Sequence, residues 1–177
     1  KTSVGLPVGP DSDAIAMFRT VLAEGRSLTR QRNEIEARSI ERLSDLTDYR
    51  LLTSIPGIGP INAMTILAEA GDVRRFPHHR QFLKFCGLDL ATCQSGTFRG
   101  RTKLSKYGNA RLRRTFWMAA QVAARQCDNS FRDKLGRYVA GHANDPDRRR
   151  KAMTALTAKM ARVAHAVIKT GTEYRPF

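Results

Sequence analysis

One serine lies in a segment whose composition suits phosphate chemistry. Residues 93–109 read CQSGTFRGRTKLSKYGN, in which Ser95 precedes Arg99, Arg101 and Lys103. A serine hydroxyl attacks a phosphorus atom only when a base or metal removes its proton, and this segment contains no histidine or carboxylate. The three cations would stabilise charge on a transferring phosphoryl group. On this chemistry alone, Ser95-Gly96 is better explained as a turn than as a nucleophile, and both interpretations stay open.

Basic residues are concentrated around this serine. Asp89 is the only acid between Arg74 and Arg114, a stretch that predicts a polyanionic partner rather than an ordinary solvated face. We expect Lys106 and the start of a following helix at Arg111, Arg113 and Arg114 to contact nucleic acid. The stretch holds eleven bases: Arg74, Arg75, Arg80, Lys84, Arg99, Arg101, Lys103, Lys106, Arg111, Arg113 and Arg114.

A glycine-rich turn upstream suggests a second contact with phosphate. Apolar residues flank the run PGIGP at 56–60, a pattern typical of a helix-hairpin-helix motif over about residues 46–70. Free N–H groups at the start of the second helix would bind phosphate without reading base sequence, through Gly57, Ile58 and Gly59. The alternative is a plain helical hairpin with a glycine turn.

Helices must position these groups, because the rest of the sequence is mainly α-helical in pattern. We expect a linker at 1–10, a helical arm at 11–50, and a helical domain at 51–177 that holds a loop or short β-hairpin at about 88–108. The apolar stripe of the arm is narrow and sparse, which favours a coiled coil that dimerises the protein. Two helices packed on the domain are the alternative. Three later helices are expected to begin at Asn109, at Asn129 or Ser130, and at Asp145.

Composition excludes several classes of protein. The net charge is +15 over 177 residues. The sequence has no long apolar run for a membrane span, its first residues KTSVGLPVGP lack the apolar core expected of a signal peptide, and its three cysteines form no CxxC pair. We expect a reducing bacterial cytoplasm with nucleoid association, and no metal site or cofactor within this chain. We also expect the chain to be the C-terminal portion of a longer protein.

Several motifs together resemble one family of mobile-element enzymes. LTSIPGIGPINAMTILAEAGDVRRF, FLKFCGLDLATCQSGTFRGRTKLSKYGNARLRRTFWMAA and the closing TEYRPF resemble the C-terminal domain of the DEDD/serine insertion-sequence transposases. These are relatives of the Piv invertase and are also called bridge-RNA-guided recombinases. The resemblance covers about residues 45–177, and the preceding arm looks like the coiled coil that joins this domain to the family's N-terminal domain.

The resemblance implies a function and a partner domain. Family members carry an RNase H-like N-terminal domain whose four acidic residues bind Mg²⁺. The C-terminal domain supplies a serine that forms a covalent link to DNA, and Ser95 matches that serine. A structured guide RNA and a homo-oligomer, a dimer through the arm or a tetramer, are also implied. We therefore expect this chain to take part in DNA cleavage and strand transfer but to be inactive alone. The rival is a non-catalytic nucleic-acid-binding module.

Overall fold

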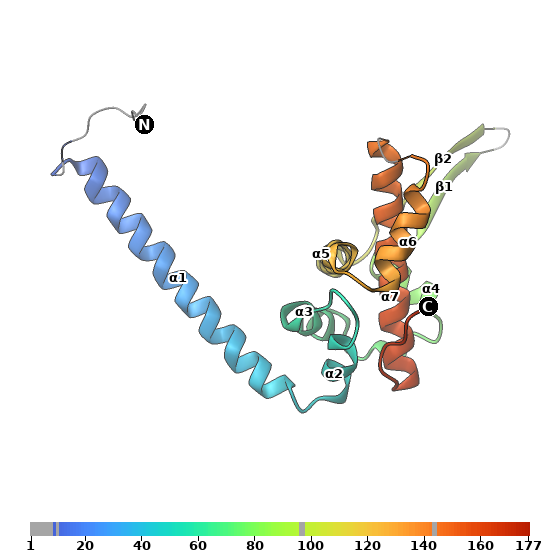
Figure 1. Ribbon diagram of the computed structural model, residues 1–177, viewed down its shortest axis with the longest axis horizontal. Coiled ribbons are helices and arrows are strands. Elements are labelled where there is room, and N and C mark those ends of the chain that lie inside the picture. The colour runs from blue at the N-terminus through green and yellow to red at the C-terminus, as the bar shows by residue number, and fades with distance from the viewer. Residues whose placement is uncertain (1–8, 10, 96–97, 143–144) are drawn as a thin grey trace. The chain divides into compact units, whose positions relative to one another are not determined.

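The computed structural model describes residues 9, 11–95, 98–142 and 145–177, and these are mainly α-helical, as predicted (Figure 1). The described elements, with η1 a 3₁₀ helix, are α1 (Asp13–Leu43), α2 (Thr47–Thr53), α3 (Pro60–Ala70), η1 (Val73–Arg75), α4 (His79–Phe85), β1 (Leu90–Ser95), β2 (Phe98–Leu104), α5 (Ala110–Arg125), α6 (Ser130–Val139) and α7 (Pro146–Thr170). The chain divides into two compact units, residues 1–41 and residues 42–177.

Helix α1 makes up almost all of the described part of the first unit. It runs unbroken through Gly25, and none of its residues is buried. Large apolar side chains remain exposed along it, including Phe18 at 66% and Leu28 at 65%. The predicted helix to about Arg50 is wrong at its end, because α1 stops at Leu43 and α2 begins at Thr47. The proposed coiled coil stays a prediction.

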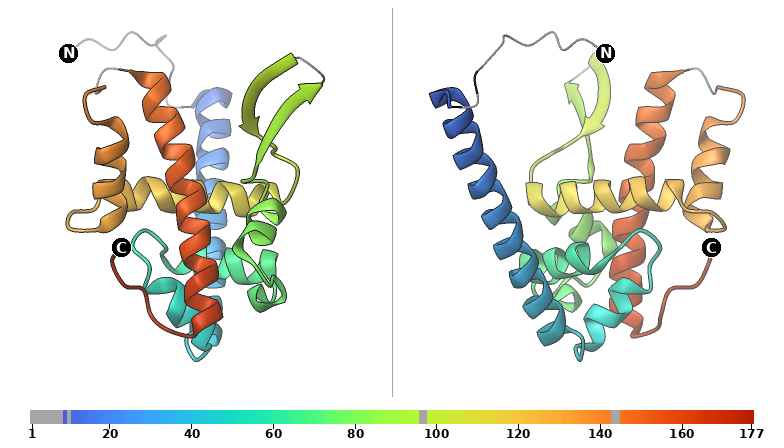
Figure 2. Two further views of the ribbon diagram at one scale, coloured as in Figure 1. Left: turned by 90° about the vertical axis from the view of Figure 1, so that its right-hand side faces the viewer. Right: turned by 60° about the vertical axis from the view of Figure 1, so that its left-hand side comes forward.

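The second unit is organised around α7. Helices α2, α4, α5, α6 and η1 all pack against α7, and α5 crosses it (Figure 2). Side chains from every one of these elements contribute to a single hydrophobic core. Its fully buried members include Leu52, Phe82, Phe116, Phe131 and Met160. Trp117 is partly buried against this core.

Short polar side chains begin the helices where the sequence indicated. Asn109 accepts a hydrogen bond from the Leu112 N–H, and Asn129 and Asp145 each accept two bonds from the N–H groups that follow them. These caps satisfy backbone donors that a helix leaves unpaired in its first turn. Asn109 is the cap that matters for the site, because it fixes where the chain turns from β2 into α5.

Candidate functional site

The predicted serine segment is a two-stranded antiparallel hairpin, β1–β2, which we call the serine hairpin. Figures 1 and 2 show it projecting from the helices of the second unit. Ser95 is the last residue of β1 and pairs with Phe98 at the start of β2. The side chains of residues 92–101 lie outside the part of the chain that the structure describes. The roles of Ser95, Arg99 and Arg101 therefore stay predictions.

A bulge interrupts the serine hairpin. Thr92 pairs with Thr102, but the next pair toward the tip is Gln94 with Arg99. One residue of β1 thus lies opposite two residues of β2. A bulge bends its strand and breaks the strict alternation of faces. Residue spacing alone therefore does not place the basic residues of β2 on one face.

Two predicted contact residues near the hairpin present free cationic side chains. Lys103 in β2 and Lys106 just after it are exposed, and neither side chain forms a hydrogen bond or ion pair with a described residue. Lys106 has a φ of 56°, an uncommon value for a residue with a side chain. Both ammonium groups are available to phosphate oxygens.

The start of α5 is tied to α3 through one carboxylate. The Asn109 side-chain amide donates to Glu69 Oε2 at 2.7 Å, and Arg111 Nη1 donates to Glu69 Oε1 at 3.0 Å. The Asn109 amide, followed by the Arg111 guanidinium, lowers the pKa of Glu69. The Arg111 side chain is still 82% exposed, so it can face a polyanion while paired. Sequence reasoning missed Glu69, since no motif links an acid to residues forty positions away.

Arg113 and Arg114 differ sharply although they are adjacent. Arg113 Nη1 donates to the backbone carbonyl oxygens of Lys106 at 3.2 Å and Cys86 at 3.4 Å. Arg114 is exposed, and its side chain has no hydrogen bond or ion pair within the described part of the chain. The sequence predicted the same role for both residues, but their surroundings are not the same.

The PGIG turn connects α2 and α3 and packs against α5. A Cβ atom on Gly57, whose φ is +87°, would lie 2.2 Å from the Ala119 carbonyl oxygen. Ile58 is 3% exposed, whereas Gly59 is exposed with open space around it. Neither glycine N–H donates to another described residue. The Ile58 N–H already donates to the Ile55 carbonyl oxygen at 3.0 Å. Gly59 is therefore the residue of this turn that is most open to a phosphate.

A groove of about 440 Å³ follows this turn. One wall is formed by residues 53–59, and the other by Val122 and residues 126–129 at the end of α5. Its rim includes Asp128, whose carboxylate would repel a phosphate. The groove itself is thus less suited to an anion than the exposed amide at Gly59.

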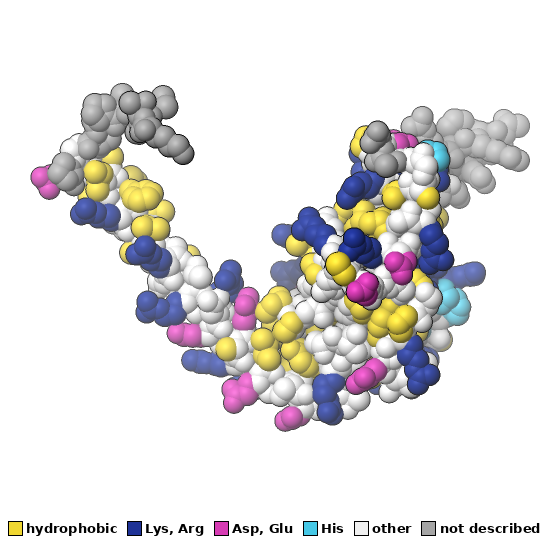
Figure 3. All heavy atoms as spheres, in the orientation of Figure 1, with side chains coloured by type: hydrophobic (Ala, Val, Ile, Leu, Met, Phe, Trp, Pro, Cys, Tyr) yellow, Lys and Arg dark blue, Asp and Glu magenta, His cyan; other side chains and the backbone are white. Residues whose placement is uncertain are grey.

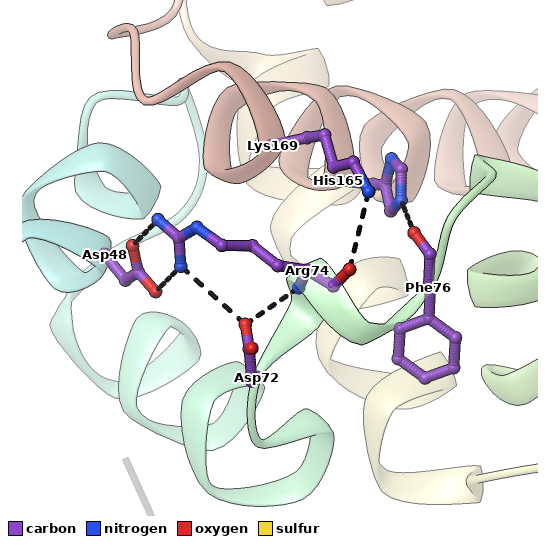
Figure 4. A network of polar contacts seen from close by, with 6 residues as sticks. All are labelled: Asp48, Asp72, Arg74, Phe76, His165 and Lys169. Carbon is purple, nitrogen blue, oxygen red and sulfur yellow. Dashed lines mark hydrogen bonds and ion pairs between the residues drawn. The ribbon is translucent and has the colours of Figure 1, made fainter.

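Several of the eleven bases stabilise the fold instead of adding to a free basic surface. Figure 4 shows Arg74 paired with both carboxylate oxygens of Asp48, at 2.6 and 2.7 Å, while Lys169 of α7 donates to the Arg74 carbonyl oxygen. The Arg75 guanidinium lies 4.7 Å from the ring centre of Phe76. These contacts join α2, η1 and α7, so part of the charge counted in the sequence is used internally.

Unpaired cations nevertheless remain in the second unit. Figure 3 shows Lys and Arg side chains over the visible face of its helices, with few acids among them. Within the stretch from Arg74 to Arg114, five described basic side chains are exposed and make no hydrogen bond, ion pair or cation–π contact with a described residue: Arg80, Lys84, Lys103, Lys106 and Arg114. A nucleic-acid backbone is the ligand that such a surface suits.

The described residues provide no metal site. No group of three or more histidine, cysteine, aspartate or glutamate side chains among them is placed to hold a metal ion. Burial raises the pKa of the Cys86 thiol to about 12, so this cysteine stays protonated and unreactive at neutral pH.

Comparison with known proteins decides the family. Residues 49–135 match the model described as "Transposase IS116/IS110/IS902 family". Those residues form a transposase domain of this family. The match runs from α2 into α6 and so contains the PGIG turn, the serine hairpin and α5.

Curated relatives agree with this assignment. A "Probable family 20 transposase" of Pseudomonas aeruginosa is 34% identical over 128 residues, which cover 71% of this chain and 36% of that protein. The transposase for insertion sequence element IS1111A of Coxiella burnetii is 28% identical over 80% of this chain and 38% of its own length. The corresponding protein of IS1328 from Yersinia enterocolitica is 29% identical over 83% and 43%.

The chain spans about two fifths of the length of these relatives. In the part that the structure describes, no helix is both long enough and apolar enough to cross a membrane.

Proposed function

We propose that this chain supplies the nucleophile and a DNA-binding surface to a transposase that cuts and joins DNA through Ser95. The proposal is supported by the position of Ser95 in the fold. It ends β1 of a hairpin inside the matched transposase domain, and the hairpin leads directly into a basic stretch of the chain.

The chemistry is an exchange of phosphodiester bonds. Ser95 Oγ would attack a DNA phosphorus, a bond from that phosphorus to a DNA oxygen would break, and the freed DNA hydroxyl would carry the proton that the serine loses. A second DNA hydroxyl would later reverse the step at a new position. Because one phosphoester replaces another, no external energy source is needed, and the cations beside the hairpin would stabilise the charged transition state.

Removal of the serine proton must be assisted from outside the segment. Residues 93–109 contain no histidine or carboxylate. The family resemblance places Mg²⁺ on carboxylates of an RNase H-like domain, and we propose that such a domain, from a second protomer, provides this assistance. On this proposal the present chain alone is inactive.

Partners follow from the same proposal. DNA would lie along the exposed basic side chains of Lys103, Lys106 and Arg114. The Arg111 guanidinium would add a further contact, and the Gly59 N–H would bind a phosphate as the turn of a helix-hairpin-helix motif does. We propose dimerisation through the apolar stripe of α1, a structured guide RNA as a second nucleic acid, and nucleoid association in a bacterial cytoplasm.

Exchange of Ser95 for alanine in a full-length transposase tests the proposal. We expect DNA binding to persist while recombination is lost. As the converse control, Lys103→Ala should weaken DNA binding and lower its salt dependence by about one phosphate contact. Recombination at an undiminished rate in Ser95→Ala would leave the rival account, a nucleic-acid-binding module without catalysis.

A further inference from the structure

The serine hairpin is joined to the helices at a tightly bonded base, formed by residues 85–89 and 105–109. The Ser105 N–H donates to the Asp89 carbonyl oxygen at 2.9 Å, and the Ser105 hydroxyl donates to the Asp89 carboxylate. The Asn109 N–H donates to the Phe85 carbonyl oxygen at 2.7 Å. These bonds extend the pairing of the two strands down to the ends of α4 and α5.

The two chain segments at this base come so close that only glycine fits at position 108, and glycine is favoured at position 87. A Cβ atom on Gly108, whose φ is +140°, would lie 2.5 Å from the Phe85 carbonyl oxygen and 2.6 Å from the Gly87 nitrogen. Gly87 has a φ of +65°, and a Cβ there would lie 2.4 Å from Arg113 Nη1. The backbone at Gly108 is thus in direct contact with the backbone of Phe85 and Gly87, and the Arg113 guanidinium lies beside Gly87.

Arg113 bonds to both segments from one end of its side chain. It reaches from the first turn of α5 to the carbonyl oxygens of Cys86, before the hairpin, and Lys106, after it. The Lys106 residue has the left-handed conformation, which is unfavourable for a residue with a Cβ and needs support from its surroundings. The bond from Arg113 to the Lys106 carbonyl oxygen provides that support.

We propose that Arg113 is a positioning residue, which fixes the serine hairpin against α5 and does not bind a DNA phosphate. The proposal rests on the proposed function of Ser95. A nucleophile at the far end of a projecting hairpin is moved by any change of angle at the base, and a small displacement greatly slows a reaction that depends on alignment. Arg114, one residue on, is exposed and its side chain has no hydrogen bond or ion pair with a described residue, so it is the phosphate-binding member of the pair.

Two matched variants separate these roles. In this chain, Arg113→Met should speed hydrogen exchange at the Ser105 and Asn109 N–H groups about tenfold or more, whereas Arg114→Met should leave both rates unchanged. In DNA binding, Arg114→Met should reduce the slope of log K against log salt by about 0.9, and Arg113→Met should leave that slope unchanged. In the full-length transposase, Arg113→Met should lower recombination at least tenfold.

A charge-preserving variant keeps the test decisive if Arg113→Met fails to fold. Lysine still binds phosphate but lacks the planar, multidentate donor group of arginine, so Arg113→Lys should also lose recombination. Full recombination in Arg113→Lys, or a slope reduced by about 0.9 in Arg113→Met with unchanged exchange, would overturn the proposal. If Ser95→Ala instead remains active, the proposed function fails while the exchange result at the hairpin base stands, so the two failures are distinguishable.

Discussion

Replacement of Gly57 by alanine should destabilise the second unit strongly. The new Cβ would meet backbone atoms of α5, at 2.2 Å from the Ala119 carbonyl oxygen and 2.8 Å from the Ala123 nitrogen. Backbone cannot move aside as a flexible side chain can, and overpacking of this kind typically costs about 1–3 kcal/mol. The φ of +87° adds about 1–2 kcal/mol for a residue with a Cβ. We therefore expect the free energy of unfolding to fall by about 3 kcal/mol.

Gly59→Ala is the matched control, two residues along the same turn. Its Cβ would meet no atom within 4 Å, and the residue has an ordinary extended conformation with a φ of −83°. Because alanine also restricts the unfolded chain, we expect a change within about 1 kcal/mol, of either sign.

Urea unfolding followed by circular dichroism at 222 nm measures both variants. The midpoint should fall for Gly57→Ala at an unchanged slope, and thermal unfolding should shift down by roughly 10 °C for a domain of this size. Equal stability of the two variants would refute the reasoning, because it would mean that the PGIG turn does not pack against α5.

Three further predictions concern Asn109 and the cysteines. Asn109→Ala removes the cap that accepts from the Leu112 N–H, so the free energy of unfolding should fall by about 1–2 kcal/mol; an unchanged urea midpoint would contradict this. In a Cys93→Ser background at pH 8, a thiol reagent should modify exposed Cys127 rapidly and buried Cys86 only on unfolding; equal rates would be the contrary result. Burial raises the pKa of the Cys86 thiol from 9.0 to about 12, so the unfolded chain loses this proton at a lower pH than the folded chain. The free energy of unfolding should therefore fall as the pH rises through that range, more steeply than in Cys86→Ala. Parallel plots of the free energy of unfolding against pH for the two proteins would contradict this.

Local signals in the sequence predicted local structure well. The Asn109 cap and the start of the last helix at Asp145 depend on neighbouring residues and were found from the sequence. The end of the arm was placed wrongly, because charged residues continue the helical pattern past Leu43, where the helix stops. At residues 88–108 the sequence does not distinguish a loop from a short hairpin, since few apolar residues mark the strands.

Long-range contacts account for what the sequence did not reveal. Arg74 forms an ion pair with Asp48, and Arg111 forms one with Glu69, and both partners are many residues away in the sequence. The number of basic residues in the sequence is therefore larger than the number of unpaired cations on the surface. Gly57 belongs to a turn whose sequence is typical of phosphate binding. Its close approach to α5 is visible only in the folded structure. The same limit applies to Arg113, whose acceptors are backbone carbonyl groups that no side-chain pattern encodes.

In the proposed reaction, the hydroxyl oxygen of Ser95 forms a bond to a DNA phosphorus. Trapping the full-length transposase on a DNA substrate, digesting both components and sequencing the nucleotide-bearing peptide by mass spectrometry tests this directly. We expect a nucleotide ester on the peptide containing residues 93–98, with the modification on Ser95. A covalent adduct on a different side chain, or none in an active preparation, would contradict it.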